Sequence, residues 1–252
     1  MNTLHRVLQK ATHSLLVNWV SIGINIPSVF ASTLPIISLN RILTQVTYSP
    51  PNVGAPGSPQ DPSSPGKGGR PGCPENARLV SFSPVTNWGE TVSDRPIFLL
   101  YSSVGSSSAE FSLWDEKSLE KLYSFPMAID PKPGLFKFRL PDDAPQLEID
   151  RLYRWQFHVS CTSLNQEQGF NVDGVIVRRS NPELQAKIES ATPEERVDLY
   201  AENGFWFDTL DELVKLRCAA PGNADLAADW ASLLEHPIVQ LNEFVEEPII
   251  CD

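Results

Sequence analysis

The chain has 252 residues, of which 41% are hydrophobic and 20% are charged, and its formal net charge is −11. This composition is typical of a folded protein with one or two domains. The acidic balance argues against nucleic acid and anionic lipid heads as charge-driven partners, because both require a basic surface.

Residues 1–31 have the pattern of a secretory signal peptide. Arg6 and Lys10 make the start basic, SLLVNWVSIGI is a short apolar run, and Val29 and Ala31 fit the −3 and −1 positions of a cleavage site. The alternative is an uncleaved anchor, but a membrane span needs about twenty apolar residues and this run has about ten. We therefore expect a periplasmic or secreted protein with no stable membrane span after cleavage. The mature chain would carry 18 basic and 31 acidic side chains, a net charge of −13.

Residues 32–72 are rich in proline and glycine and include SPPNVGAPGSPQDPSSPGKGGRPG. Proline fixes φ, glycine loosens the backbone, and few apolar side chains remain to be buried. The composition predicts a disordered or extended linker that holds the folded part away from the surface it leaves.

Residues 73–180 are expected to form a β-sandwich. Short segments recur between turn residues: ARLVSF, RPIFLLY, AEFSLW, KLYSF, LFKFRL, YRWQFHVSC and VDGVIVRR. In YRWQFHVSC, Tyr153, Trp155 and Phe157 would face the interior, while the residues between them would face solvent. Seven such strands favour an antiparallel sandwich of the immunoglobulin or fibronectin III type.

A second signal for this sandwich precedes YRWQFHVSC. Leu147 stands six residues before Tyr153, as in the corner of fibronectin type III-like sandwiches, where the tyrosine hydroxyl bonds back to the backbone. Asp150 suits the turn between them, although glycine is usual at that position. The fold class predicted for the whole chain is α+β, because the segments that follow are helical.

Residues 181–252 form an acidic helical segment with 16 acidic and 4 basic side chains. Asn181 is a helix cap followed by proline at the first helical position. Thr192 and Glu195 form a capping box, and Gly204 supplies a left-handed stop. After that stop the sequence continues through two further apolar-faced segments.

The run from Arg196 to Asn223 resembles one hairpin of a tetratricopeptide repeat. Five positions fit that pattern: Tyr200, Gly204, Trp206, Leu213 and Pro221. Val197 and Thr209 depart from it, because smaller residues are preferred there. A solenoid needs about three repeats to bury its own core. We therefore expect this short TPR-like segment to pack its apolar faces on the sandwich; the alternative is that it docks a partner protein.

The four cysteines are widely spaced: Cys73, Cys161, Cys218 and Cys251. They show no C-x-x-C spacing, which disfavours a zinc or thioredoxin-like site. In an oxidising compartment they predict two disulfides. Three pairings are open, and we favour Cys73–Cys161 with Cys218–Cys251 because each pair stays within one region. Free buried thiols are the alternative.

Candidate chemical groups are sparse. His158 and His236, the histidines of the mature chain, are expected at the surface, with no sequence sign of the orienting group that a catalytic histidine needs. The acidic residues do not form a calcium loop, so no metal or cofactor is expected. Phe205, Trp206 and Trp230 are candidate partner-binding residues, although such aromatics more often fill a core.

The order of motifs is similar to that of a known family. PGCP is followed by DRPIFLLY, AEFSLWDE, LYRWQFHVSC and ATPEERVDLYAENGFWFDTLDEL, with a cysteine near the C-terminus. Over about residues 73–252 the chain resembles the bacterial domain of unknown function 928 family, most specifically at residues 191–213. The resemblance implies secreted proteins of photosynthetic bacteria, and it implies no activity and no functional residues.

Two functions from different classes fit these observations. The first is a non-enzymatic binding or assembly module of the cell envelope that contacts an unknown envelope protein or polymer. The second is a hydrolase of envelope polymer, because glycoside chemistry needs only two carboxylates brought together by folding. We expect the first function, since the sequence shows no reactive constellation.

Overall fold

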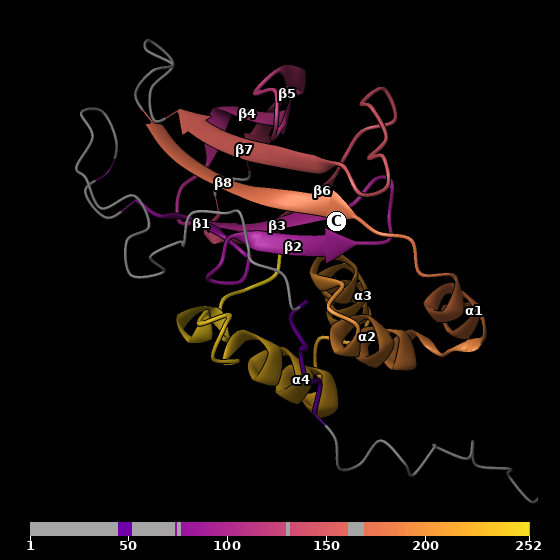
Figure 1. The fold of residues 1–252 in the computed structure, drawn as a ribbon. Coiled ribbons are helices and arrows are strands. Elements are labelled where there is room, and N and C mark those ends of the chain that lie inside the picture. Colours follow the sequence, from indigo (N-terminus) through magenta and orange to yellow (C-terminus); the bar gives the residue numbers. More distant parts are fainter. Residues whose placement is uncertain (1–44, 52–73, 75–76, 130–131, 161–168, 252) are drawn as a thin grey trace, which may run out of the picture. The chain divides into compact units, whose positions relative to one another are not determined.

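The structure, a computed structural model, describes residues 45–51, 74, 77–129, 132–160 and 169–251. They belong to one compact unit, Leu43–Asp252. The predicted signal peptide and most of the predicted linker lie outside the described residues. The described part is an α+β fold with two β-sheets and four α-helices (Figure 1).

Eight strands of the described chain form the two sheets. The smaller sheet has the antiparallel order β1 (Leu79–Ser81), β3 (Ile97–Ser102), β6 (Gly134–Arg139). The larger sheet has the order β2 (Trp88–Thr91), β8 (Gly169–Arg178), β7 (Leu152–Ser160), β4 (Ser106–Asp115), β5 (Lys121–Ile129). In the larger sheet every pairing is antiparallel except that of β2 with β8, which is parallel.

The two sheets pack face to face through aromatic side chains. The ring of Phe98 on β3 lies 4.9 Å from that of Phe111 on β4 and 5.4 Å from that of Trp155 on β7, measured between centroids. Phe138 on β6 stacks on Phe157 of β7 at 5.5 Å. The alternation predicted for β7 is confirmed, because Trp155 and Phe157 are buried and the residue between them is exposed.

Strand β2 is present in the structure but is not one of the seven strands that the sequence predicts. It has four residues, all buried, so it shows no alternation of polar and apolar side chains. Trp88 at its start pairs with Val175 of β8. Gly89 lies against Phe207 of a helix, and a Cβ at Gly89 would come within 2.6 Å of that ring. This short strand therefore forms the contact between the larger sheet and the helices.

The predicted corner before β7 is present. The Tyr153 hydroxyl accepts a hydrogen bond from the Glu148 amide at 3.0 Å, and Leu147 is buried. Asp150 has a φ of 63°, the left-handed conformation for which glycine is usual. Its backbone amide donates to the carbonyl of Arg178 at 2.8 Å, which ties the corner to the end of β8.

Four α-helices follow the strands: α1 (Pro182–Ser190), α2 (Pro193–Glu202), α3 (Trp206–Ala219) and α4 (Ala224–Leu234). A short 3-10 helix, η2, covers Asn242–Phe244. The predicted caps are confirmed: the Asn181 side chain accepts from the backbone of α1, and Thr192 and Glu195 form the capping box of α2. Gly204 ends α2 with a φ of 79°.

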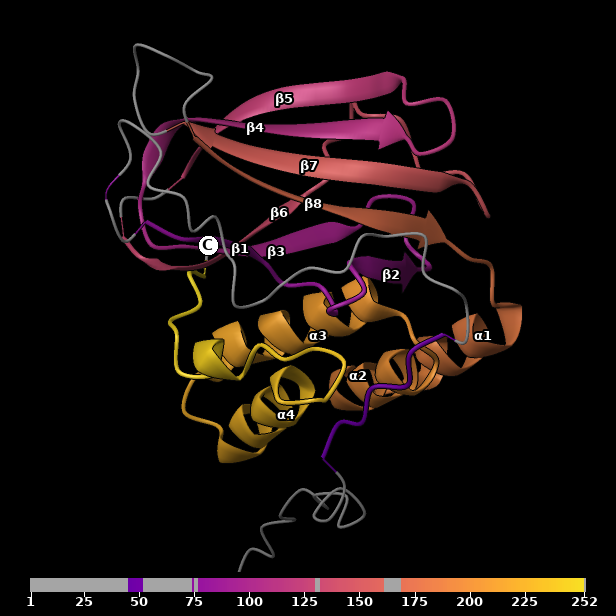
Figure 2. The same ribbon diagram turned by 60° about the vertical axis from the view of Figure 1, so that its left-hand side comes forward.

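The helices lie on the sheets, and α3 lies next to β2 and β3 (Figure 2). Trp206 at the start of α3 donates its indole N–H to the carbonyl of Phe82 at 2.8 Å. Phe207 meets Phe98 of β3 at 5.6 Å, and Trp230 of α4 stacks on Phe82 at 6.0 Å. The apolar faces of the hairpin are therefore covered by the β part of the same chain.

Residues 45–51, which lie within the predicted linker of residues 32–72, belong to the folded unit. This segment, which we call the strap, is extended and packs against the helices, with Val46 and Tyr48 only 1% and 2% exposed. Val46 and Tyr48 alternate with the exposed residues of the strap, which is the period of a half-buried extended chain. The proline and glycine content of the longer stretch conceals this short alternation.

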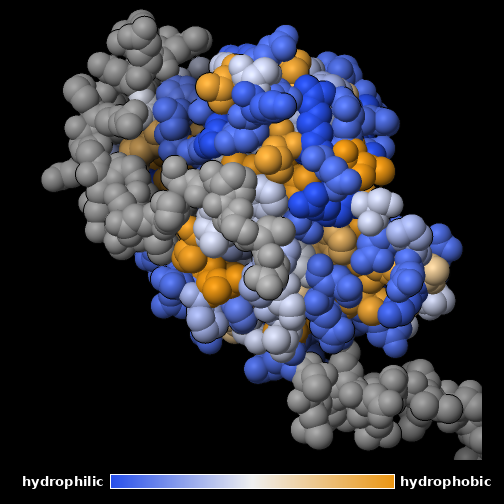
Figure 3. All heavy atoms as spheres, viewed as in Figure 1, coloured by the Kyte–Doolittle hydropathy of each residue, from blue (hydrophilic) through white to orange (hydrophobic). Residues whose placement is uncertain are grey.

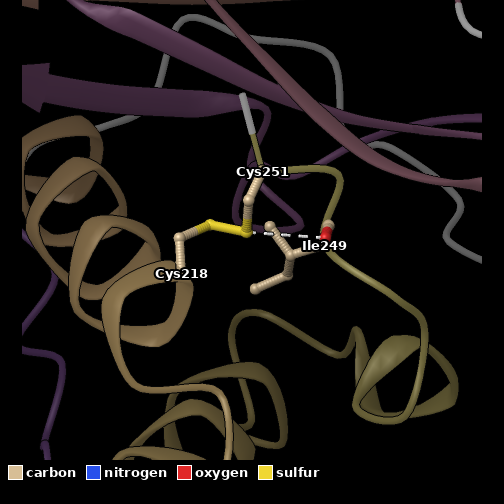
Figure 4. The surroundings of a disulfide bond; sticks show 3 residues. All are labelled: Cys218, Ile249 and Cys251. Carbon is tan, nitrogen blue, oxygen red and sulfur yellow. Dashed lines mark hydrogen bonds between the residues drawn. A yellow bond between two sulfur atoms is a disulfide. The ribbon is translucent and has the colours of Figure 1, made fainter.

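The last described residues are fixed at two points. The Leu135 amide on β6 donates to the carbonyl of Pro248 at 2.8 Å, and the Ile250 amide donates to the carbonyl of Leu135 at 2.7 Å. Cys251 then forms a disulfide with Cys218 in the last turn of α3 (Figure 4). This is the pairing that the sequence favours for these two cysteines; Cys73 and Cys161 lie outside the described residues.

We expect a Cys218→Ser/Cys251→Ser variant to be destabilised by about 4 kcal/mol, because the bond closes a loop with a sequence separation of 33 residues. For a unit of this size the loss corresponds to a fall in Tm of roughly 10 °C. Thermal unfolding followed by circular dichroism measures it, with exposed Ala219→Ser in the same helical turn as the control. A Tm within 2 °C or so of the parent would contradict a structural role for the bond.

Candidate functional site

The strap lies along α2 and α4 and is held mainly through its backbone (Figures 1 and 2). The Val46 amide donates to Oδ1 of Asp229 on α4 at 3.2 Å, and the Ser232 hydroxyl donates to the Val46 carbonyl at 3.0 Å. The Ser49 amide donates to the carbonyl of Ala201 near the end of α2 at 3.0 Å. Two helices thus supply partners to the main chain of one extended segment.

Tyr48 is the aromatic anchor of the strap. Its ring meets Trp206 edge-on at 4.9 Å and His236 at 6.1 Å. Its hydroxyl donates to the carbonyl of Gly204 at 3.4 Å. Burial, and then the charge of Glu90, raise the pKa of Tyr48, so the phenol stays neutral at physiological pH. The anchor therefore brings no charge into the interior.

Gly204 is required at this place for two reasons. Its φ of 79° is left-handed, which ends α2 as the sequence predicts. A Cβ at this position would also come within 2.9 Å of the Ser49 carbonyl oxygen and 3.0 Å of Pro51. The second reason depends on the strap, so the sequence around Gly204 alone does not reveal it.

Asp229 is a buried acid, with 6% of its surface exposed. The acids of a charge-rich helical segment usually face solvent, but Asp229 does not. The sequence does contain a sign that Asp229 is buried. It stands three residues after Leu226 and four before Leu233, within the apolar stripe of α4. An acid in such a stripe needs a donor, and the Val46 amide supplies one.

We define the strap site as the residues on and between the helices that contact the strap: Ala201, Gly204, Trp206, Asp229, Ser232 and His236. Of the predicted partner-binding residues, only Trp206 is among them. Phe205, Trp206 and Trp230 are 3%, 0% and 0% exposed, so they are core residues and offer no free surface to a partner. Phe205 belongs to a small apolar cluster with Leu184 and Ile188 of α1.

Three acids at the start of α3 are the nearest match to the paired carboxylates of a hydrolase. Burial raises the pKa of Asp208 to about 7, although its Oδ2 accepts from the Val92 amide at 3.1 Å. Asp211 Oδ2 contacts Arg139 at 2.6 Å and Lys215 at 3.0 Å. Lys215 also meets Glu212 at 3.0 Å. These acids therefore have structural partners that join α3 to β6 and to the loop after β2.

His158 on β7 has two polar neighbours that its sequence context does not indicate. Its Nδ1 lies 2.7 Å from Oδ1 of Asn171, and its Nε2 lies 3.2 Å from the Ser160 hydroxyl. A hydroxyl, an imidazole and an amide in this order resemble a catalytic triad, in which a base activates a nucleophile and a third group orients the base. Ser160 is only 5% exposed, so we assign the three side chains to a polar network that joins β7 to β8.

His236 lies near the other end of the described chain and is half-buried. Its ring packs on Tyr48, and its Nδ1 accepts from the Ile238 amide at 3.4 Å. In the described residues no group of three or more His, Cys, Asp or Glu side chains could hold a metal ion. In the same part of the chain, no helix combines the length and apolar character needed to cross a membrane.

On the face seen in Figure 1, hydrophilic residues predominate, and hydrophobic ones form separate small areas (Figure 3). The apolar side chains of the strap, Val46 and Tyr48, are buried. The feature that remains as a candidate for recognition is the strap site, because it already holds an extended peptide segment.

Residues 65–249 match the sequence profile of one family, described as Domain of Unknown Function (DUF928). The chain belongs to this family. The resemblance stated from the sequence motifs is thereby confirmed. No curated protein sequence matches the chain.

Two solved structures are distantly similar to this DUF928 chain. The CARDB domain of the PF1109 protein from Pyrococcus furiosus, in complex with di-metal ions, is 14% identical with a TM-score of 0.22, covering 41% of this chain and 96% of that domain. A beta-glucuronidase from Parabacteroides merdae is 12% identical with a TM-score of 0.25, covering 70% of this chain and 28% of the enzyme. At these scores neither one informs the function.

We expect Gly204→Ala to destabilise the protein by more than the roughly 1–2 kcal/mol of a left-handed alanine, because the new Cβ also displaces the strap. The free energy of unfolding in urea measures the loss. Gly222→Ala is the matched control, since a Cβ there would meet nothing within 4 Å. Equal effects of the two substitutions would show that the strap does not press on Gly204.

The raised pKa of Asp208 predicts a pH dependence of stability. Between its ordinary value of 3.8 and about 7, folded Asp208 keeps a proton that the unfolded chain has lost, so the free energy of unfolding falls as the pH rises through this range. Asp208→Asn should remove this part of the slope and leave the protein more stable at pH 7. Urea unfolding at several pH values checks it, with exposed Asp225→Asn as the charge-matched control. A slope that Asp208→Asn leaves unchanged would assign the titration to another group.

Proposed function

We propose that the protein is a secreted or periplasmic, non-enzymatic binding or assembly module of the cell envelope, with an envelope protein or polymer as its partner. The signal-like sequence of residues 1–31 supports this location. The Cys218–Cys251 disulfide is consistent with it, because such bonds persist in oxidising compartments.

The observation that carries the proposal is the strap site. An extended segment is held by main-chain hydrogen bonds from two helices and by one buried tyrosine, Tyr48. Backbone bonds supply affinity for an extended chain, and a pocket for one side chain supplies specificity; peptide-recognition domains combine the same two elements. These contacts support a role of the helices in holding an extended peptide.

We further infer that the fold is of the immunoglobulin or fibronectin III type with a TPR-like hairpin. Three strands face five, as in such sandwiches, and the tyrosine corner precedes β7. The hairpin is α2 and α3, and α4 begins a second unit. The strap contacts α2 and α4, the first helices of the two units, which in helical repeat arrays line an extended concave binding surface.

The test separates a binding module from a hydrolase. The parent and an Asp208→Asn/Asp211→Asn variant are purified from the envelope fraction, their N-termini are sequenced, and each is incubated with isolated envelope polymer. We expect a mature N-terminus near Ser32, a partner retained by the parent, and no polymer cleavage by either protein. A cytoplasmic chain with Met1 intact would contradict the location. Cleavage by the parent that the variant lacks would replace the binding module with the hydrolase.

A further inference from the structure

We propose that the strap site takes the strap of a second copy of this chain, so that two copies assemble by exchanging residues 45–51. The inference rests on the proposed role as an assembly module and names its partner. The strap is the occupant that the structure shows in this site, and its contacts define what the site recognises. The chemistry it recognises is an apolar residue, a spacer and a tyrosine in an extended chain.

The contacts between the strap and the other described residues are non-covalent. Val46 and Tyr48 fill the interior, and the amides of Val46 and Ser49 meet Asp229 and Ala201. A strap from another copy would make the same set, so exchange loses none of these interactions. This is the condition under which an identical element can be swapped between protomers at low cost.

The chain beside the strap is long enough for exchange. Residues 52–73 separate the strap from Pro74, the next described residue, and 22 residues can span up to roughly 75 Å. A compact unit of about 200 residues is only roughly 45 Å across. These 22 residues include five prolines and six glycines and few apolar side chains. A strap could therefore reach the site of a neighbouring copy.

Concentration decides between the two arrangements. Within one copy the strap meets its own site at an effective concentration on the order of millimolar, so the closed monomer dominates in dilute solution. Exchange joins two copies without adding contacts to the strap site. The fraction of exchanged dimer therefore rises with the local concentration of the protein, as on an envelope surface. The net charge of −13 on residues 32–252 opposes the approach of two copies, so added salt should favour the dimer.

The first arm of the experiment tests the site. A mature chain without residues 32–51 is titrated with the peptide QVTYSPP, and the change in Tm and in tryptophan fluorescence is recorded, since Trp206 contacts Tyr48. We expect saturable binding, at least tenfold weaker for the same peptide with alanine in place of Tyr48. A deletion variant that is folded by circular dichroism but does not bind the peptide would overturn the proposal.

The second arm uses intact mature chains, so it does not depend on whether the deletion variant folds. Light and isotope-labelled parent chains are mixed at rising protein concentration and salt, and native mass spectrometry counts mixed dimers. We expect mixed dimers that increase with both variables and fall at least tenfold for Tyr48→Ala. Parent chains that stay monomeric at millimolar concentration would make the strap a permanent part of its own copy.

A third arm shows which copy supplies the strap. Asp229→Arg damages the site and leaves the strap intact; Tyr48→Ala damages the strap and leaves the site intact. We expect the two variants to form a one-to-one dimer when mixed and no comparable dimer alone. Dimers that form equally well in either variant alone would place the interface elsewhere. Failure of exchange alongside capture of an envelope partner would reject this inference and leave the proposed function standing.

Discussion

The position of Trp206 between two layers of the molecule determines how the rest is arranged. Its indole donates to the carbonyl of Phe82 on the side of the sheets, and its ring meets Tyr48 on the side of the strap. Helices α3 and α4 carry large apolar side chains that must be covered by other parts of the chain. The sheets cover one part of this apolar surface and the strap covers another, so the helices, the sheets and the strap share a single core.

Local patterns in the sequence predict those parts of the fold that local physics decides. The alternation around Trp155, the caps at Asn181 and Thr192, and the corner at Tyr153 each depend on residues within about seven positions of one another. Such short-range rules hold wherever the element lies in the final fold. Seven strands and the capped starts of two helices can therefore be predicted from the amino-acid sequence alone.

The features that the sequence does not predict depend on contacts between residues that are far apart in the chain. The strap meets Gly204, Asp229 and Ser232 across sequence separations of 156, 183 and 186 residues. Strand β2 is fully buried, so it lacks the polar and apolar alternation that marks a strand with one wet face. The position of Asp229 within an apolar stripe indicates a buried acid. Its hydrogen-bond donor, the Val46 amide, lies in a segment whose composition suggests disorder. The candidate site joins two regions that look unrelated when each is considered alone.

The long separation between the strap and its helices also sets the order of events during folding. The strap is synthesised well before α4, so the backbone groups of Val46 lack their partners on α4 until nearly the whole unit has been made. Contacts of such long range close late and slowly, because the entropy of a large loop must be lost first. The core is then completed at its two extremes, by the strap and by Cys251. A nascent chain of this kind therefore stays incompletely packed for most of its synthesis, and its core is completed late.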